Sequence, residues 1–96
     1  MVGTCRVGND PADRPCELVV VDEAPLKSWY VYTCATSEEA FEQLGEQVAL
    51  EVHAEGKEFV GSAMFKRTHN IAVEERSKYY PVGVELRGTG PLKEAE

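Results

Sequence analysis

The clearest hydrophobic pattern covers residues 47–66, where two runs of alternating apolar and polar side chains flank a turn. The pattern predicts a β-hairpin with Glu55 and Gly56 as its turn residues. The register that follows pairs Ala54 with Lys57, Val52 with Phe59, Leu50 with Gly61 and Val48 with Ala63. Because this register puts the large apolar side chains on one face and leaves the other face mostly polar, we expect the hairpin to cover a core with one side only.

Two more strands are predicted before this hairpin. Residues 18–21 are four consecutive apolar residues, which is typical of a strand at 17–22 that is buried on both faces or closes a barrel. Residues 27–34 are rich in aromatic and β-branched side chains and predict a second strand. One face would carry Trp29, Val31 and Thr33, and the other would carry Tyr30, Tyr32 and Cys34. We expect either that both faces are covered or that one is an exposed aromatic strip.

A short helix is predicted between these strands and the hairpin. Thr36 and Glu39 have the spacing of a capping box, so the helix is expected to start near Ser37. Its apolar stripe is expected to comprise Ala40, Phe41 and Leu44. Gly45 then follows as the residue that ends the helix in a left-handed conformation.

The C-terminal third contains one more alternating segment. Residues 79–87 predict a strand, and Pro81 has no amide hydrogen to donate, so we expect this strand to begin at or lie along a sheet edge. Residues 67–78 are ambiguous: Asn70 fits the cap of a short helix, whereas Ile71 and Val73 fit a brief strand. We expect a loop with a short strand there.

These elements predict one small domain. Residues 1–15 are dense in turn-forming residues and are expected to form an N-terminal lead-in loop that can include a short strand near Thr4 to Val7. A β-rich domain over 16–91 and a frayed tail over 92–96 are expected to follow. The expected fold is mainly β, on the α+β borderline: a five-stranded antiparallel barrel or strongly bent sheet of the OB or SH3-like kind, with one short α-helix. Glycines inside strands, at 61 and 83, favour the barrel over the alternative, a β-grasp-like sheet.

The charge of the chain narrows the classes of partner. The formal net charge is -7 and the isoelectric point is near 4.8, so the protein repels phosphate backbones and anionic lipid headgroups. Direct nucleic-acid binding is therefore disfavoured and no membrane contact is expected. The acidic residues are concentrated in the first two thirds of the chain, which predicts a negative face that suits a basic protein surface.

Cysteine usage indicates a reducing compartment. Cys5, Cys16 and Cys34 are an odd number, and the N-terminus has neither a basic region with an apolar run nor a stretch of about 20 apolar residues. We therefore expect a cytoplasmic protein with free thiols. A Cys5–Cys16 bridge after oxidation, or a zinc site made of the three cysteines and one histidine, are the alternatives. No closely spaced ligand pair predicts a metal, and no cofactor is expected.

Catalytic patterns are not found in the sequence. A thiol such as Cys34 would need a base, for example His69, and an orienting group, but neither a nucleophile elbow nor a glycine-rich phosphate loop accompanies them. We therefore expect no enzyme activity.

The hypothesis that remains is a non-catalytic protein-interaction domain: an adaptor, inhibitor or assembly subunit that uses an acidic surface, an edge strand at 79–87, or both. The contact residues expected on the acidic surface are Asp22, Glu23, Tyr30, Tyr32, Glu38, Glu39, Glu42 and Glu46. The partner would be another protein with a basic surface, or a second copy of the chain. The alternative is an OB-like module that binds nucleic acid or a small ligand through Trp29, Tyr30, Tyr32, Tyr79 and Tyr80.

Overall fold

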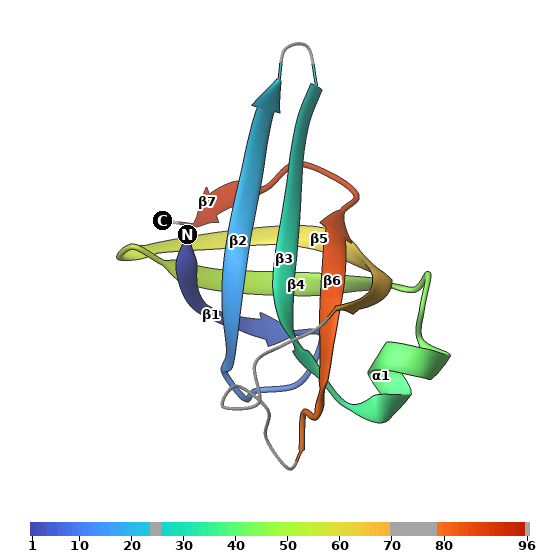
Figure 1. The fold of residues 1–96 in the computed structure, drawn as a ribbon. Helices are drawn as coiled ribbons and strands as arrows, with labels where there is room; N and C mark the ends of the chain where they lie inside the picture. Colours follow the sequence, from blue (N-terminus) through green and yellow to red (C-terminus); the bar gives the residue numbers. More distant parts are fainter. Residues whose placement is uncertain (24–25, 70–78, 96) are drawn as a thin grey trace.

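The computed structural model describes residues 1–23, 26–69 and 79–95 (Figure 1). In these ranges the elements are β1 (Val2–Val7), β2 (Arg14–Glu23), β3 (Leu26–Ala35), α1 (Ser37–Glu42), β4 (Gln47–Ala54), β5 (Lys57–His69), β6 (Val82–Gly88) and β7 (Lys93–Ala95). Strands dominate, and the one helix among the described residues connects β3 to β4.

The strands form a closed antiparallel barrel. The order around the barrel is β1, β2, β3, β6, β5 and β4, and β4 closes the circle by pairing with β1. The short strand β7 adds to β5 next to the point where β6 leaves it. The predicted small barrel is thus confirmed, with six strands in the wall instead of five. The β-grasp alternative is wrong, because the sheet closes on itself.

The central hairpin of β4 and β5 has the predicted register. Ala54 pairs with Lys57 and Leu50 with Gly61, and the same alignment continues to the end of β4. Glu55 and Gly56 both have positive φ, 52° and 75°. Left-handed conformations at both turn positions suit the right-handed twist of the two strands, so the turn chemistry and the hydrophobic alternation fix the same register.

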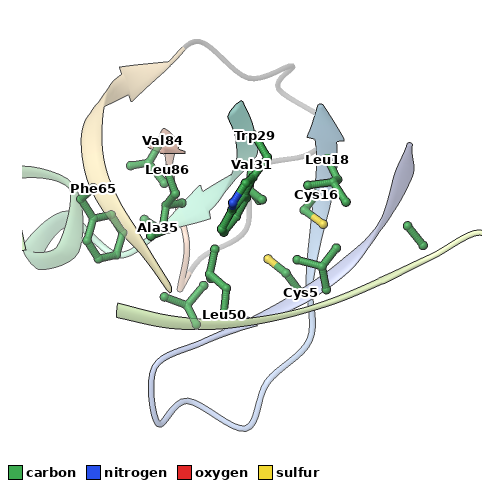
Figure 2. Close-up of a cluster of buried hydrophobic side chains, with 14 of the residues drawn as sticks. Cys5, Cys16, Leu18, Trp29, Val31, Ala35, Leu50, Phe65, Val84 and Leu86 are labelled. Atoms are coloured by element: carbon green, nitrogen blue, oxygen red, sulfur yellow. The ribbon is translucent and has the colours of Figure 1, made fainter. Parts of the chain in front are cut away.

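Alternation along the six strands of the wall sends one set of side chains into the barrel. Figure 2 shows the packed interior, in which the labelled residues are Cys5, Cys16, Leu18, Trp29, Val31, Ala35, Leu50, Phe65, Val84 and Leu86. The Trp29 ring lies over Gly88 and Gly61, where a side chain on either glycine would collide with the indole. Glycine at these two strand positions therefore makes room for the largest side chain of the core.

Both ends of the chain belong to the sheet. The predicted lead-in at 1–15 contains β1, which pairs with β2 and β4 and contributes Cys5 and Val7 to the core. Residues 93–95 of the predicted frayed tail form β7. The alternation in β1 involves only two large inward side chains between turn-forming stretches, which is why its pattern is weak in the sequence.

The predicted edge strand at 79–87 is wrong. β6 lies between β3 and β5 and pairs with both, so its backbone has no free side over this length. Pro81 immediately precedes β6 and does not interrupt its ladder. A proline just before a strand is compatible with a central strand, because the missing amide falls outside the pairing.

The helix begins as predicted and ends early. Thr36 caps α1, and the capping box with Glu39 is present. The helix ends at Glu42, three residues before Gly45, whose φ is 87°. Of the predicted apolar stripe only Ala40 is buried; Phe41 and Leu44 are exposed, so that part of the prediction is wrong. β5 extends to His69, so residues 67–69 are strand; the alternatives proposed for residues 70–78 lie outside the described part of the chain.

Candidate functional site

A buried arginine organises the end of the barrel that carries α1. Arg14, the first residue of β2, is only 1% exposed. Its two terminal nitrogens bind both carboxylate oxygens of Glu39 at 2.9 and 3.0 Å, and they also reach Asp10 Oδ2 at 2.9 Å and the Cys34 carbonyl at 3.1 Å. The guanidinium carbon lies 4.3 Å from the centre of the Tyr80 ring. This network, hereafter the Arg14 network, joins β2, β3, α1 and the segment before β6.

The Arg14 network holds its two acids in the charged form. Burial alone would raise the pKa of Glu39, but hydrogen bonds from Arg14 and from the backbone of Thr36 lower that pKa below its usual value. Donation by the Tyr80 hydroxyl at 2.6 Å, with further hydrogen bonds from the Ala12 amide and Arg14, lowers the pKa of Asp10 to about 2. The buried positive charge is thus compensated by carboxylates that remain ionised at neutral pH.

The Glu39–Arg14 contact sets the rotation of α1 about its axis. Glu39 and the buried Ala40 face the barrel, so Phe41, about 200° around the helix from Glu39, faces solvent, whereas Leu44 lies beyond the end of α1. Phe41 is 64% exposed and Leu44 is 47% exposed. An apolar surface next to a charged network is left uncovered here because Glu39, not Phe41, fills the inward position.

Acidic side chains surround these two apolar residues. We call the group Glu38, Phe41, Glu42, Leu44 and Glu46 the α1 patch; its three glutamates are exposed. None of the three forms an ion pair with another described residue. The α1 patch therefore combines two exposed apolar side chains with three glutamates that no described cation pairs with.

The segment after the helix is fixed to the barrel by backbone hydrogen bonds. The Gly45 amide donates to the Phe65 carbonyl at 2.8 Å, and the Phe65 amide donates to the Glu46 carbonyl at 3.2 Å. These bonds hold the chain immediately after Leu44 against β5. The α1 patch is consequently presented on a short element that is anchored at Arg14 and at Phe65.

The structure separates the eight contact residues expected from the sequence. Asp22 and Glu23 lie at the far end of β2, near the tip of the β2–β3 hairpin, whereas α1 lies toward the opposite end of the barrel (Figure 1). Tyr30 and Tyr32 lie on β3 between these two ends. Of the glutamates, Glu39 is engaged by Arg14, which leaves Glu38, Glu42 and Glu46 together.

The five aromatic residues considered for nucleic-acid or ligand stacking do not form one platform. Trp29 points into the barrel and Tyr80 belongs to the Arg14 network. On the outer wall, Tyr30 lies against Arg87, and the Tyr32 ring is 4.7 Å from the His69 ring. Tyr79 is exposed, next to the start of β6.

The three cysteines are free and buried, and the Cys5 thiol donates to the Thr33 hydroxyl at 3.5 Å. Among the described residues no group of three His, Cys, Asp or Glu side chains converges to hold a metal ion. Within the same part of the chain, no helix has the length and hydropathy needed to cross a bilayer.

Two features of this site were not predicted from the sequence. The burial of Arg14 has no signal in its neighbours Asp13 and Pro15, because its partners lie 4, 20 and 25 residues away. The exposure of Phe41 follows from the rotation that Arg14 imposes on α1. The available signal was composition: Glu38, Glu39 and Glu42 leave the six-residue helix only two apolar side chains, too few for a wide core-facing stripe.

Comparisons with protein-family models, with curated proteins and with solved structures found no match to this chain. A function therefore has to be inferred from the geometry and charge of the chain itself.

Proposed function

We propose that this protein is a non-catalytic protein-interaction domain and that the α1 patch is its contact surface. The observation that carries the proposal is the exposure of Phe41, 64%, among three exposed glutamates that have no ion-pair partner in residues 1–23, 26–69 and 79–95. Exposed apolar residues ringed by charge are typical of interaction sites. The role that fits is that of an adaptor, inhibitor or assembly subunit.

The chemistry of the α1 patch defines the partner. Phe41 and Leu44 supply apolar anchors, which contribute most of the free energy of binding when a partner buries them. Glu38, Glu42 and Glu46 raise the association rate with a positively charged surface and repel an acidic one. The expected partner is a basic protein segment with an apolar side chain at its centre.

A different protein fits better than a second copy of this chain. In a two-fold symmetric dimer the α1 patch would face itself, and six glutamates would then be brought together without compensating cations. Like charges placed opposite each other weaken such a contact.

A cytoplasmic location agrees with the three free thiols and is part of the proposal.

The test is charge reversal at the α1 patch. The triple variant Glu38→Lys, Glu42→Lys, Glu46→Lys is isolated at low salt from cells that produce the protein, and native mass spectrometry reads the mass of any complex. We expect the wild-type complex to be lost. Glu39 is left intact, because its reversal would place two cations in the Arg14 network and would unfold the end of the barrel.

The matched control reverses three exposed glutamates outside the α1 patch: Glu17→Lys, Glu51→Lys and Glu94→Lys. Both triple variants have the same net charge, so any effect of total charge is equal in the two. Retention of the complex by the α1 variant, or equal loss in both variants, would rule out the α1 patch as the contact surface.

A further inference from the structure

A second site lies at the other end of the barrel, where the β2–β3 hairpin extends beyond its neighbours (Figure 1). The β3–β6 pairing stops at Tyr30 opposite Arg87, while the β2–β3 pairing continues to Glu23 opposite Leu26. β6 separates from β3 at this point, and a pocket of about 580 Å³ lies there. That volume lies within the range of small-molecule sites, roughly 300 to 1,000 Å³.

Apolar side chains form most of the pocket surface. Trp29, Phe59 and Leu92 line it, and Val20, which is directly opposite Trp29 in the β2–β3 ladder, is 48% exposed there. Val20 belongs to the inward-facing set of β2 but lies above the end of the barrel wall. Val20 therefore points to the same side as the core residues of β2, but no strand of the barrel wall covers it.

The indole of Trp29 is fixed before any ligand arrives. Its Nε1 donates to the Gly90 carbonyl at 2.8 Å, and the ring lies against Gly88 and Gly61. The polar group of the side chain is therefore satisfied within the protein, and the ring, 5% exposed, contributes a small apolar surface to the pocket in a single orientation. A preorganised apolar surface reduces the entropy cost of binding.

One cation lies at the edge of the pocket. Arg87 belongs to the pocket lining, and its guanidinium lies over the Tyr30 ring and donates to the Tyr30 hydroxyl at 2.9 Å. Arg6, Arg14 and Arg67 each pair with a carboxylate, but no described carboxylate lies within 4.0 Å of Arg87. Tyr30 orients this guanidinium, and no carboxylate in the described part of the chain compensates its positive charge.

We propose that this pocket binds a small amphipathic monocarboxylate, with the apolar part on Trp29, Phe59 and Leu92 and the carboxylate on Arg87. An arginine fork matches the two oxygens of a carboxylate. Arg87 is the one cation among the described residues that line the pocket, and on an acidic protein it suits one negative charge and disfavours multiply charged phosphates. The site is separate from the α1 patch, so it holds or fails independently of the proposed function.

Trp29 is the only tryptophan in the chain, so its fluorescence reports directly on the pocket. Decanoate, kept below its micelle concentration, is titrated into the protein, and 1-decanol serves as the neutral ligand of equal length. We expect a saturable change in Trp29 emission with decanoate and binding about tenfold weaker with decanol, a difference of about 1.4 kcal/mol.

Two arginine variants test whether Arg87 binds the carboxylate of the ligand. Arg87→Gln should weaken decanoate binding about tenfold and leave decanol binding unchanged. The control, Arg67→Gln, removes an arginine that already pairs with Glu85 at 3.3 Å and should leave decanoate binding unchanged. Circular dichroism of each variant checks that the exposed substitutions leave the fold intact.

An independent measurement locates the ligand. Decanoate should shift the amide NMR signals of Gly88, Thr89 and Gly90, which line the pocket. Absence of saturable binding, equal affinity for decanoate and decanol, undiminished binding by Arg87→Gln, or shifts confined to α1 would each overturn the proposal.

Discussion

Arg14 and Glu39 form a two-point ion pair across the end of the barrel, with Nη1–Oε1 and Nη2–Oε2 distances of 2.9 and 3.0 Å. The same Glu39 carboxylate accepts a hydrogen bond from the Thr36 amide in the capping box. One side chain therefore caps α1 and anchors the helix to β2. The direction in which α1 presents Phe41 depends on this double role.

Loss of the Glu39 carboxylate is expected to be costly. Glu39→Ala leaves the buried Arg14 with less compensation and removes half of the capping box, so the free energy of unfolding should fall by about 3 to 5 kcal/mol. Urea unfolding measures the change. Glu38→Ala is the control, because Glu38 is exposed on the same helix and should change stability by less than about 0.5 kcal/mol. Similar small losses in both variants would mean that the Arg14 network does not hold α1.

The stability of the fold is expected to decrease in acid. The folded-state pKa of Asp10, about 2, lies below the value of about 3.9 for an unperturbed aspartate. A lowered folded pKa contributes stability that is complete above about pH 4 and is lost as the pH falls toward 2. Urea midpoints at pH 5 and pH 3 should differ less in Asp10→Asn than in the wild type.

The cause of this pKa shift can be tested separately. Tyr80→Phe removes the hydroxyl that donates to Asp10 Oδ2, so the Asp10 pKa should rise toward its usual value. An NMR titration of the Asp10 carboxyl group measures the pKa. Tyr79→Phe changes the neighbouring tyrosine and should leave the Asp10 titration unaltered; an equal effect of both variants would contradict the assignment.

The hairpin turn is expected to depend on backbone conformation alone. Gly56 has a φ of 75°, and a Cβ at this position would meet no heavy atom within 4 Å, so Gly56→Ala introduces strain without a clash. We expect a loss of about 1 to 2 kcal/mol in thermal or urea unfolding. Gly90→Ala is the control, since Gly90 is equally open but does not have a positive φ. An equal loss in the control would mean that the left-handed turn is not the cause.

The thiols are expected to be unreactive in the folded protein. Cys5, Cys16 and Cys34 are at most 6% exposed, and burial raises the pKa of the Cys34 thiol. Ellman's reagent should therefore react slowly with the native protein. In denaturant it should react with all three thiols. Rapid reaction of one thiol without denaturant would show that it is accessible and would contradict the described packing.

The sequence predicted best those features that depend on local pattern. The β4–β5 register followed from alternation and from the Glu55-Gly56 turn, and the start of α1 followed from Thr36 and Glu39. Both are determined by residues close to one another in the chain, so a local pattern contains the information.

The features that depend on distant residues were not predictable in this way. β6 lies in the middle of the wall because β3 and β5 pair with it, which its own alternation cannot show. Arg14 is buried because Asp10, Glu39 and Tyr80 converge from separate segments. The exposure of Phe41 is a consequence of that convergence, so the proposed contact surface could be predicted only as an acidic region.

The most direct test of the α1 patch is photo-crosslinking from position 41. p-Benzoylphenylalanine replaces Phe41 in one variant and, in the control, replaces Val2, which is 80% exposed on β1. Both variants are irradiated in cells that produce the protein, and the adducts are identified by mass spectrometry. The proposal predicts a discrete protein adduct from position 41 only, lost when Glu38, Glu42 and Glu46 are changed to lysine. The same adducts from both positions, or none from position 41, would contradict it.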